Sequence, residues 1–418
     1  MRRNFDVLES QTIKYLVYGF FIYFILGTIL VWSIFRPWLH RRPYFIEPNL
    51  SVLPFSISLL TFGLTMAFTG YLYAKNLRTT TLIGSLFIGL GYMTCSVGMF
   101  FPSLALYMII IGFGILVGIG TGFLYNVPVV MIGQSSLNNK GTVLGSVLMG
   151  FGVSALIMSP VIDIFIRSFN ISSTFLILGV TYMSALFYLG LTLNFSIKSS
   201  KPLSSNKMFQ HIGYANFSKI LKDKNFYFLW TVYAIGVGIG QAIIGYAKLI
   251  AIDITGLKDS LDYMATFAVS VLAIGNTILR PFYGKLIDLI GPKWTLTVTL
   301  IIQMFCLIVL LPNANNPTTL YLSLFLFGST YGAYFVIMPI FTSYIYKTEF
   351  LGQAYGVLFT AYGIGGFTIP IFFSRILNNR NTLDAYIESF YSLTIFIIIA
   401  LILTLHVKPK NMLKSLIK

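Results

Sequence analysis

Apolar runs of membrane-spanning length alternate with short polar segments along the whole chain. An α-helix needs about 20 mainly apolar residues to cross the hydrocarbon core, so each run predicts one transmembrane helix. These runs cover residues 15–36, 51–74, 80–101, 104–131, 142–166, 173–195, 226–251, 262–290, 294–312, 318–346, 352–375 and 388–407. The pattern therefore predicts an all-helical (all-α) membrane protein with about twelve spans.

The longest polar interval between spans divides them into two sets of six. It covers residues 196–225 and contains six lysines. We therefore predict two six-helix halves, residues 1–195 and 226–418, joined by a cytosolic linker. Four positions of the first half recur with the same residue type 211 positions later: Gly141, Gly145, Gly152 and Pro128. This repetition indicates a pseudo-repeat, although small residues four apart also serve close packing of membrane helices.

Basic residues are distributed unequally between the two sets of loops. The chain ends and the even-numbered loops contain about nineteen lysines and arginines, and the other loops about seven. The positive-inside rule then places both termini in the cytosol or its equivalent. The pattern leaves open whether the membrane is the plasma membrane or that of an organelle.

Composition agrees with a membrane protein. The chain has 418 residues, 56% of them hydrophobic and 10% charged, and a mean hydropathy of +0.83. Its formal charge of +16 comes from loops and chain ends, so nucleic acid is not an expected partner. Cys95 and Cys306 lie in separate halves and predict no disulfide framework. The sequence has no metal-ligand spacing, nucleophile with its base or phosphate-binding loop, so we expect neither an enzyme nor a cofactor.

Arg280 is a charged residue inside the apolar stretch from about Tyr263 to Ile290. A charge at that depth costs about 3 kcal/mol or more unless a partner compensates it. An anion is the natural partner, because one guanidinium binds one carboxylate through two parallel hydrogen bonds, whereas a dianion requires two cations. The alternative is a structural pairing with backbone carbonyls or with Asp163 or Asp253, both of which lie near the opposite membrane face.

Lys248 is a second basic residue within a predicted span, toward its outer end. It is a candidate second cation for the substrate, part of a funnel for arriving anions, or a lysine that reaches the membrane surface. The histidines, His40, His211 and His406, and the acids fall in loops or toward helix ends. A mid-membrane proton relay is therefore not expected, and anion exchange or passage of an anion with its own proton fits better.

The segment from Gly284 to Lys293 ends the eighth predicted helix with glycines, Asp288 and lysine. It resembles the loop signature of the major facilitator superfamily, in which the glycine admits a tight contact and the acid pairs with charges at neighbouring helix ends. The resemblance implies gating roles for Gly284, Asp288 and Lys293, whereas a solvated helix-end charge is the alternative for Asp288. In the first half Gly70 matches Gly284, but Ala74 replaces the acid, so we expect that gate to be held less tightly.

Five motifs in the same order resemble one branch of that superfamily, the oxalate/formate antiporters and related monocarboxylate carriers. They extend over nearly the whole chain, at residues 27–37, 118–128, 280–284, 331–339 and 358–363. The resemblance implies the major facilitator fold, with twelve transmembrane helices in two six-helix halves. It also implies transport by alternating access around a central site.

In that branch an arginine of the eighth helix and a lysine of the eleventh hold the substrate carboxylates. The arginine corresponds to Arg280, and the lysine position is Tyr362, which removes one positive charge and leaves a hydroxyl group. The resemblance therefore implies substrate-binding roles for Arg280 and Tyr362. It also favours a small monocarboxylate, such as formate, lactate or pyruvate, over oxalate.

Aromatic side chains form the walls of the family's site. Tyr125 and Tyr331 match these walls in kind, whereas Leu30 and Phe335 stand where tyrosine is common. Trp32, in the first motif, is a further candidate for substrate contact. Packing is the alternative role for each of them, because aromatic residues make up 16% of the chain.

Together these features predict a monomeric secondary transporter in the lipid bilayer, with a small carboxylate anion as substrate and a proton or counter-anion as a possible second solute. Two alternatives remain open at this point. One is a carrier of another small organic solute, such as an amino acid or nutrient. The other is a membrane sensor that binds a metabolite without transporting it.

Overall fold

The computed structural model describes residues 2–47, 50–73, 76–133, 139–192, 220–255, 262–346, 351–377 and 383–407. Helices make up most of these ranges, which contain no β-strand. Two compact units divide the chain: the first comprises residues 1–137, 147–213 and 348–360, and the second residues 138–146, 214–347 and 361–418. The division of the sequence at a linker of residues 196–225 stays a prediction, because most of that segment lies outside the described residues.

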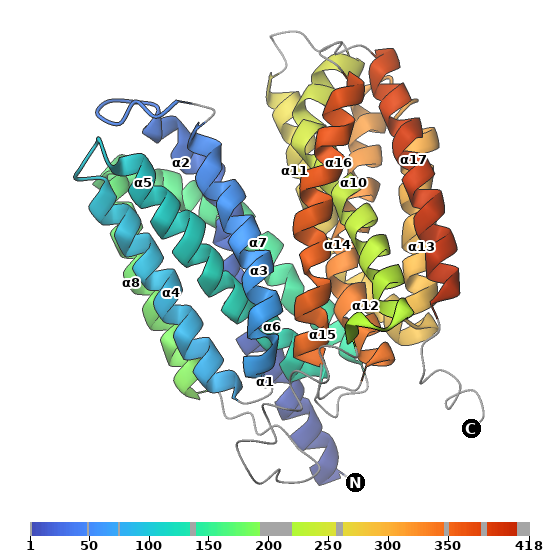
Figure 1. Cartoon of the computed structure of the whole chain (residues 1–418), viewed down its shortest axis with the longest axis horizontal. Coiled ribbons are helices and arrows are strands. Elements are labelled where there is room, and N and C mark those ends of the chain that lie inside the picture. Colours follow the sequence, from blue (N-terminus) through green and yellow to red (C-terminus); the bar gives the residue numbers. More distant parts are fainter. Residues whose placement is uncertain are drawn as a thin grey trace. The chain divides into compact units, whose positions relative to one another are not determined.

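The first unit contains the helices of the first six predicted spans and one helix from later in the chain. They are α1 (Arg2–Leu26), α2 (Trp32–Leu39), α3 (Leu53–Tyr73), α4 (Leu77–Gly98), α5 (Ala105–Ile109), α6 (Gly118–Gly133), most of α7 (Lys140–Phe169), α8 (Ile171–Thr192) and α15 (Leu351–Leu358). A 3-10 turn at Gly27–Val31 joins α1 to α2, and a π-helical segment at Ile110–Val117 joins α5 to α6. Within this unit α4 packs along α8, and α3 packs along α6 (Figure 1).

The second unit contains the remaining helices. They are α10 (Lys224–Thr255), α11 (Asp262–Ile278), α12 (Arg280–Ile290), α13 (Pro292–Phe305) with its π-helical continuation Cys306–Leu310, α14 (Pro317–Ile345), α16 (Thr360–Leu377) and α17 (Leu383–His406). The first turns of α7 also belong to this unit. Within it α14 packs against α10, α11 and α13, and is the most deeply buried of the long helices.

Several of these helical segments follow one another without a loop, and we call each such continuous helix a rod. In the described parts of the chain the rods match the twelve predicted spans. Ten of the rods are long and apolar enough to cross a membrane, and Leu53–Thr69 is a shorter apolar helix. The remaining rod, α11 with α12, is interrupted at Leu279. The predicted all-helical membrane fold is therefore confirmed.

Polar groups within the spans are satisfied mainly by their own helices. The hydroxyls of Thr81, Thr121 and Thr342 each donate to the backbone carbonyl four residues earlier, at 2.7–2.8 Å. Such bonds let hydroxyl side chains lie in a medium without water, where an unpaired polar group is costly.

The interior of the second unit contains a neutral hydrogen-bonded group. The Tyr334 hydroxyl donates to Gln303 Oε1 at 2.5 Å, and Gln303 Nε2 donates to the carbonyl of Gly236 at 3.2 Å. Both side chains are fully buried. These bonds connect α10, α13 and α14, so Gln303 serves the packing of three helices.

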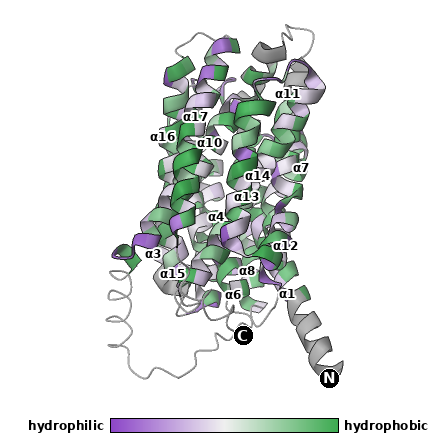
Figure 2. Ribbon diagram, turned by 90° about the vertical axis from the view of Figure 1, so that its right-hand side faces the viewer, coloured by the Kyte–Doolittle hydropathy of each residue, from purple (hydrophilic) through white to green (hydrophobic). Residues whose placement is uncertain are grey.

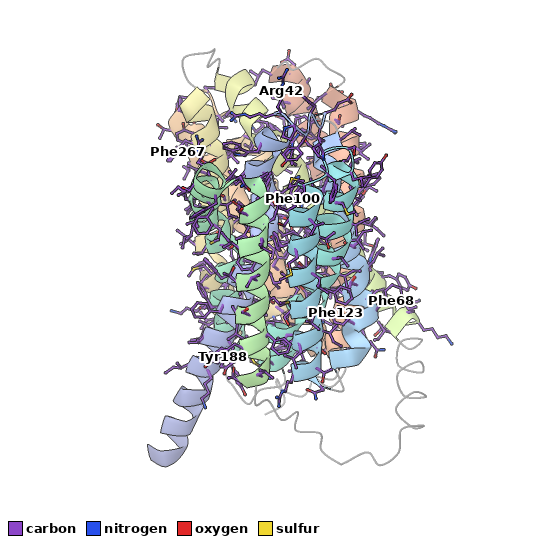
Figure 3. All side chains as sticks on the ribbon, turned by 90° about the vertical axis from the view of Figure 1, so that its left-hand side faces the viewer. Arg42, Phe68, Phe100, Phe123, Tyr188 and Phe267 are labelled. Carbon is purple, nitrogen blue, oxygen red and sulfur yellow. The ribbon has the colours of Figure 1, made fainter. Side chains whose placement is uncertain are left out.

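Apolar side chains cover the outer surfaces of the helices. Figure 2 shows apolar residues along much of the coloured helices in view, with many of the hydrophilic residues toward helix ends. Phe68 of α3, Tyr188 of α8 and Phe100 in the turn after α4 are among the most exposed large side chains (Figure 3). A surface of this kind suits contact with lipid, because apolar area exposed on this scale would be unfavourable in water.

Candidate functional site

Arg280 is the first residue of α12 and follows the interruption at Leu279. Pro281 explains this interruption, because it has no backbone N–H to donate to the preceding turn and its ring displaces that turn. The Arg280 side chain is buried, with 3% of its surface exposed. The helix break therefore lies next to a charged residue in the interior of the unit.

Asn276, one turn before Arg280, orients the guanidinium group. Arg280 Nε donates to the Asn276 carbonyl oxygen, and Arg280 Nη2 donates to Asn276 Oδ1, each at 3.0 Å. Both acceptors are neutral, so these two bonds fix the orientation of the guanidinium without cancelling its charge. Asp163, an alternative partner predicted from the sequence, pairs instead with Arg167 at 2.7 Å in the first unit. The side chain of Asp253 lies outside the described residues.

Phe335 brings Arg280 together with two of the predicted tyrosines. The guanidinium carbon of Arg280 lies 5.3 Å from the centroid of the Phe335 ring, within cation–π range. The same ring makes edge contacts with Tyr331 at 5.2 Å and with Tyr362 at 5.7 Å. Arg280, Tyr331, Phe335 and Tyr362 are all at least nine-tenths buried. We refer to them as the Arg280 cluster.

Gln241 joins this cluster from α10, and the sequence analysis missed it. Its Nε2 donates to the hydroxyl oxygen of Tyr331 at 2.9 Å and to that of Tyr362 at 3.1 Å. The signal in the sequence was an isolated amide within an apolar span, which is unusual at membrane depth. It was overlooked because Gln241 carries no charge and stands far from both tyrosines along the chain.

Tyr125 and Trp32 belong to the first unit. Tyr125 lies in an aromatic group, with ring centroids 5.0 Å from Tyr23, 5.1 Å from Phe62 and 5.2 Å from Phe359. It is 2% exposed. Its predicted contact with substrate stays a prediction.

Trp32 is engaged in the packing of its own unit. Its indole N–H donates to the Ser51 carbonyl at 2.8 Å, and its ring lies 4.4 Å from that of Phe113. Lys248 and Gly70 lie in α10 and α3, and their side-chain surroundings are outside the described part of the chain. The predicted roles of these three residues stay predictions.

Asp288 caps the beginning of α7 from the neighbouring helix α12. Its Oδ1 accepts a hydrogen bond from the backbone N–H of Gly141 at 2.9 Å, and its Oδ2 accepts from the backbone N–H of Thr142 at 2.8 Å. The Thr142 hydroxyl donates to Oδ2 as well, at 2.7 Å. The first N–H groups of a helix have no partner within the helix and carry partial positive charge, so a carboxylate is well suited to them. The partner of this acid in the structure is therefore the start of a neighbouring helix.

Glycines allow α7 and α12 to approach closely enough for this cap. A Cβ atom on Gly284 would overlap the carbonyl oxygen of Gly141, and one on Gly145 would overlap the carbonyl oxygen of Arg280. Only hydrogen is tolerated at these positions without a backbone shift. The predicted tight contact at Gly284 is thus present in the structure, whereas its role in gating stays a prediction.

Lys293 lies in the first turn of α13, two residues after Gly291, which is the single residue between α12 and α13. Gly291 adopts φ 81° and ψ 161°, a conformation that favours glycine, and it ends α12 and begins α13. Lys293 Nζ donates to the carbonyls of Leu405 and Val407, at 2.7 and 3.0 Å, at the end of α17. A cation at a helix C-terminus is favoured by the helix dipole.

Asn126 of α6 makes a hydrogen bond to α15 within the first unit. Its Nδ2 donates to the Gly352 carbonyl at 2.8 Å, and the side chain is fully buried. This residue stood within the motif of residues 118–128 but was not assigned a role from the sequence.

The fold, the broken helix with its buried arginine and the loop motif define a multi-pass membrane protein of the transporter class. The Major Facilitator Superfamily model matches residues 15–370 and 262–415, so the chain belongs to this superfamily. Its members are transporters and not enzymes. The sequence-based assignment to the superfamily is confirmed, and assignment to the oxalate/formate antiporter branch stays a prediction.

Known proteins similar to this chain support the same class. An uncharacterized MFS-type transporter of Escherichia coli K12, YhjX, is 23% identical over 346 residues, which cover 82% of each chain. The proton:xylose symporter XylE, solved with 6-bromo-6-deoxy-D-glucose, has a TM-score of 0.72 at 14% identity and covers 98% of this chain and 100% of its own. FucP in the outward conformation has a TM-score of 0.72 at 14% identity, with coverage of 94% and 99%. At these identities the two structures show the shared fold.

Proposed function

We propose that this protein is a secondary active transporter of a small monocarboxylate of the formate, lactate or pyruvate type, working by alternating access. The observation that supports this most directly is the buried guanidinium of Arg280, held by Asn276 beside Phe335, whose ring also contacts Tyr362. A guanidinium fixed in this way can bind one carboxylate with two parallel hydrogen bonds. Burial strengthens that interaction, because water competes little at such a position.

The charge of the cluster favours a monoanion over a dianion. Tyr362 stands where the related carriers have lysine, and its hydroxyl accepts a hydrogen bond from the neutral amide of Gln241. The second carboxylate of a dianion would therefore face phenol and amide groups and no second cation. The free energy needed to remove this carboxylate from water would not be offset. A single carboxylate requires only Arg280.

Coupling by anion exchange, or by passage of the anion with a proton it brings, agrees with the polar side chains around Arg280. The side chains joined by hydrogen bonds there, Asn276, Gln241, Tyr331 and Tyr362, are neutral amides and phenols. None of these four is a carboxyl or imidazole group, the kinds of side chain that usually relay protons within a membrane. The anion itself is then the simplest carrier of any coupled charge or proton.

The test is uptake of radiolabelled solutes into proteoliposomes that contain the purified protein, with and without internal counter-substrate. The panel comprises formate, acetate, pyruvate, lactate and oxalate, together with xylose and fucose as neutral solutes. We expect uptake of monocarboxylates, faster with an internal monocarboxylate. Uptake of xylose or fucose in place of every monocarboxylate would contradict the proposal.

Arg280→Gln tests the residue that the proposal depends on. Loss of a charge-assisted bidentate contact should weaken monocarboxylate transport, as kcat/KM, by about 100-fold, and Arg280→Lys should weaken it less. Arg167→Gln is the matched control, because Arg167 is an exposed arginine paired with Asp163 in the first unit. Unchanged uptake in Arg280→Gln, at equal amounts of folded protein, would remove Arg280 from the site.

A further inference from the structure

We propose that Arg41 and Arg42, in the loop after α2, bind the phosphate of an anionic phospholipid in the leaflet around this end of the first unit. Exposed aromatic side chains beside them contact the glycerol and upper acyl chains of the same lipid. We refer to residues 40–46 as the arginine loop. It belongs to the first unit, and lipid binding there does not depend on which solute is transported.

The arginine loop follows the first membrane span directly. A continuous helix runs from α1 through the 3-10 turn Gly27–Val31 and ends with α2 at Leu39. Figure 3 shows Arg42 at the end of the first unit that lies away from the start of α1. The ends of membrane spans lie at the depth of the phospholipid headgroups. Arg41 and Arg42 are therefore at the level of the lipid phosphates.

Both arginines are exposed, and each is held over an aromatic ring. The guanidinium carbon of Arg41 lies 4.8 Å from the centroid of the Trp38 ring, and that of Arg42 lies 5.9 Å from the centroid of the Phe45 ring. The face of a ring attracts a cation without cancelling its charge. Neither arginine forms an ion pair with any other residue that the structure describes. Two adjacent positive charges are thus available to an anion.

Arg167, at the end of α7, is a neighbouring arginine whose charge is already paired. Its guanidinium carbon lies 5.7 Å from the centroid of the Trp38 ring, so it belongs to the same surface. Its Nε donates to the carboxylate of Asp163 at 2.7 Å. Residues 36–47 contribute three arginines and one acid, Glu47. The excess positive charge of this surface therefore comes from α2 and the arginine loop.

Exposed aromatic side chains lie beside the arginine loop. The Tyr44 hydroxyl donates to the Met99 carbonyl at 3.2 Å, which holds the loop against the turn after α4. Phe100 and Phe101 in that turn are 71% and 54% exposed, and Phe45 is 64% exposed. Phenyl groups exposed to this extent are unfavourable in water and favourable at the boundary between headgroups and acyl chains. The surface thus combines cations with an apolar area.

An anionic phospholipid has both groups that this surface can bind. Its phosphate accepts charge-assisted hydrogen bonds from guanidinium N–H groups, and its glycerol and acyl chains are apolar partners for the phenylalanines. A zwitterionic phospholipid has the same phosphate but also an ammonium group, which two arginines repel. A soluble anion would leave the phenylalanines in water. The combination of charges and exposed rings therefore favours a lipid.

Native mass spectrometry of the purified full chain in detergent tests this, with phosphatidylglycerol and phosphatidylcholine of the same acyl chains as probes. Wild type should bind phosphatidylglycerol at least about tenfold more tightly than phosphatidylcholine. Each arginine near a membrane surface contributes about fivefold, so Arg41→Gln/Arg42→Gln should bind the two lipids about equally. Arg167→Gln is the matched control and should keep the wild-type preference, because Asp163 already pairs that charge.

Phe100→Ser tests the apolar part of the surface. It removes a phenyl group and no charge, so it should weaken the binding of both lipids and leave the preference for phosphatidylglycerol unchanged. Inorganic phosphate, added at the same concentration as phosphatidylglycerol, should not displace the lipid, because it gains no contact with the phenylalanines.

Three results would overturn the proposal. They are equal affinity of wild type for the two lipids, an unchanged preference in Arg41→Gln/Arg42→Gln, and displacement of phosphatidylglycerol by an equal concentration of inorganic phosphate. The first and third require no variant to fold. An unchanged lipid preference with slower monocarboxylate uptake in the double variant would assign the two arginines to the path of the substrate instead. None of the three results bears on the proposed function, which is tested by solute uptake.

Discussion

Replacing Asp288 by alanine removes the cap from the first turn of α7. The carboxylate accepts hydrogen bonds from the backbone N–H groups of Gly141 and Thr142 and from the Thr142 hydroxyl, at 2.7–2.9 Å. In Asp288→Ala both N–H groups lose their acceptor. Asp288→Asn retains one neutral carbonyl acceptor and loses the negative charge. The two variants therefore separate loss of the bonds from loss of charge alone.

The magnitude follows from the position of this carboxylate. A helix N-cap stabilises by about 1 kcal/mol, and a negative charge at a helix N-terminus adds about 0.3–1 kcal/mol. Larger values apply to buried charged groups, but Asp288 is exposed and water competes for it. We therefore expect Asp288→Ala to destabilise the first turn of α7 by about 1–2 kcal/mol, which is a factor of about 5–30 in its opening equilibrium.

Hydrogen–deuterium exchange followed by mass spectrometry measures this opening directly. The peptide that contains Gly141 and Thr142 should exchange faster by about 5–30-fold in Asp288→Ala, and by less in Asp288→Asn. Asp163→Asn is the control, because it removes an acid that pairs with Arg167 one turn away on the same helix. Unchanged exchange at the start of α7 in a folded Asp288→Ala protein would refute this reasoning. Faster exchange with unchanged transport would support the cap as a stabilising contact and contradict a role for Asp288 in gating.

Two further substitutions test other contacts. Tyr362→Lys adds the second cation that the resemblance to oxalate/formate antiporters implies for this position, so oxalate should compete with labelled pyruvate about tenfold better than in wild type, measured as inhibition of uptake. No change would contradict the role assigned to the missing charge. Gly284→Ala places a methyl group against the Gly141 carbonyl. It should lower the thermal stability of the detergent-purified protein and the transport rate of the reconstituted protein. Gly245→Ala is its control, because a Cβ atom there has no neighbour within 4 Å, and equal effects of the two would argue against a special contact at Gly284.

Much of the fold was predictable because each span has its own signal in the sequence. Continuous apolar length identifies a membrane helix without knowledge of its neighbours, and the predicted runs agree with the rods of the structure. The break at Leu279 also has a local cause in Pro281.

The site was predictable only where a single residue carried the signal. Arg280 is conspicuous because a charge in an apolar span needs a reason. Gln241 acquires its role from Tyr331 and Tyr362, which stand 90 and 121 residues later in the chain. No local pattern encodes such a contact, because it depends on which faces of three helices meet. The same holds for Asp288, whose carboxylate oxygens accept hydrogen bonds from backbone N–H groups that stand 146 and 147 residues earlier in the chain.

The turn at Gly291 has a practical consequence for measuring motion in this protein. Asp288 holds the start of α7 on one side of that turn, and Lys293 holds the end of α17 on the other. Only Gly291 lies between α12 and α13, so we expect these two helices, with the helix ends that they contact, to move together. A spin label or fluorophore placed beside Leu405 should therefore report displacement of the first turn of α7. A label on that turn itself would disturb the contact between Gly141 and Gly284.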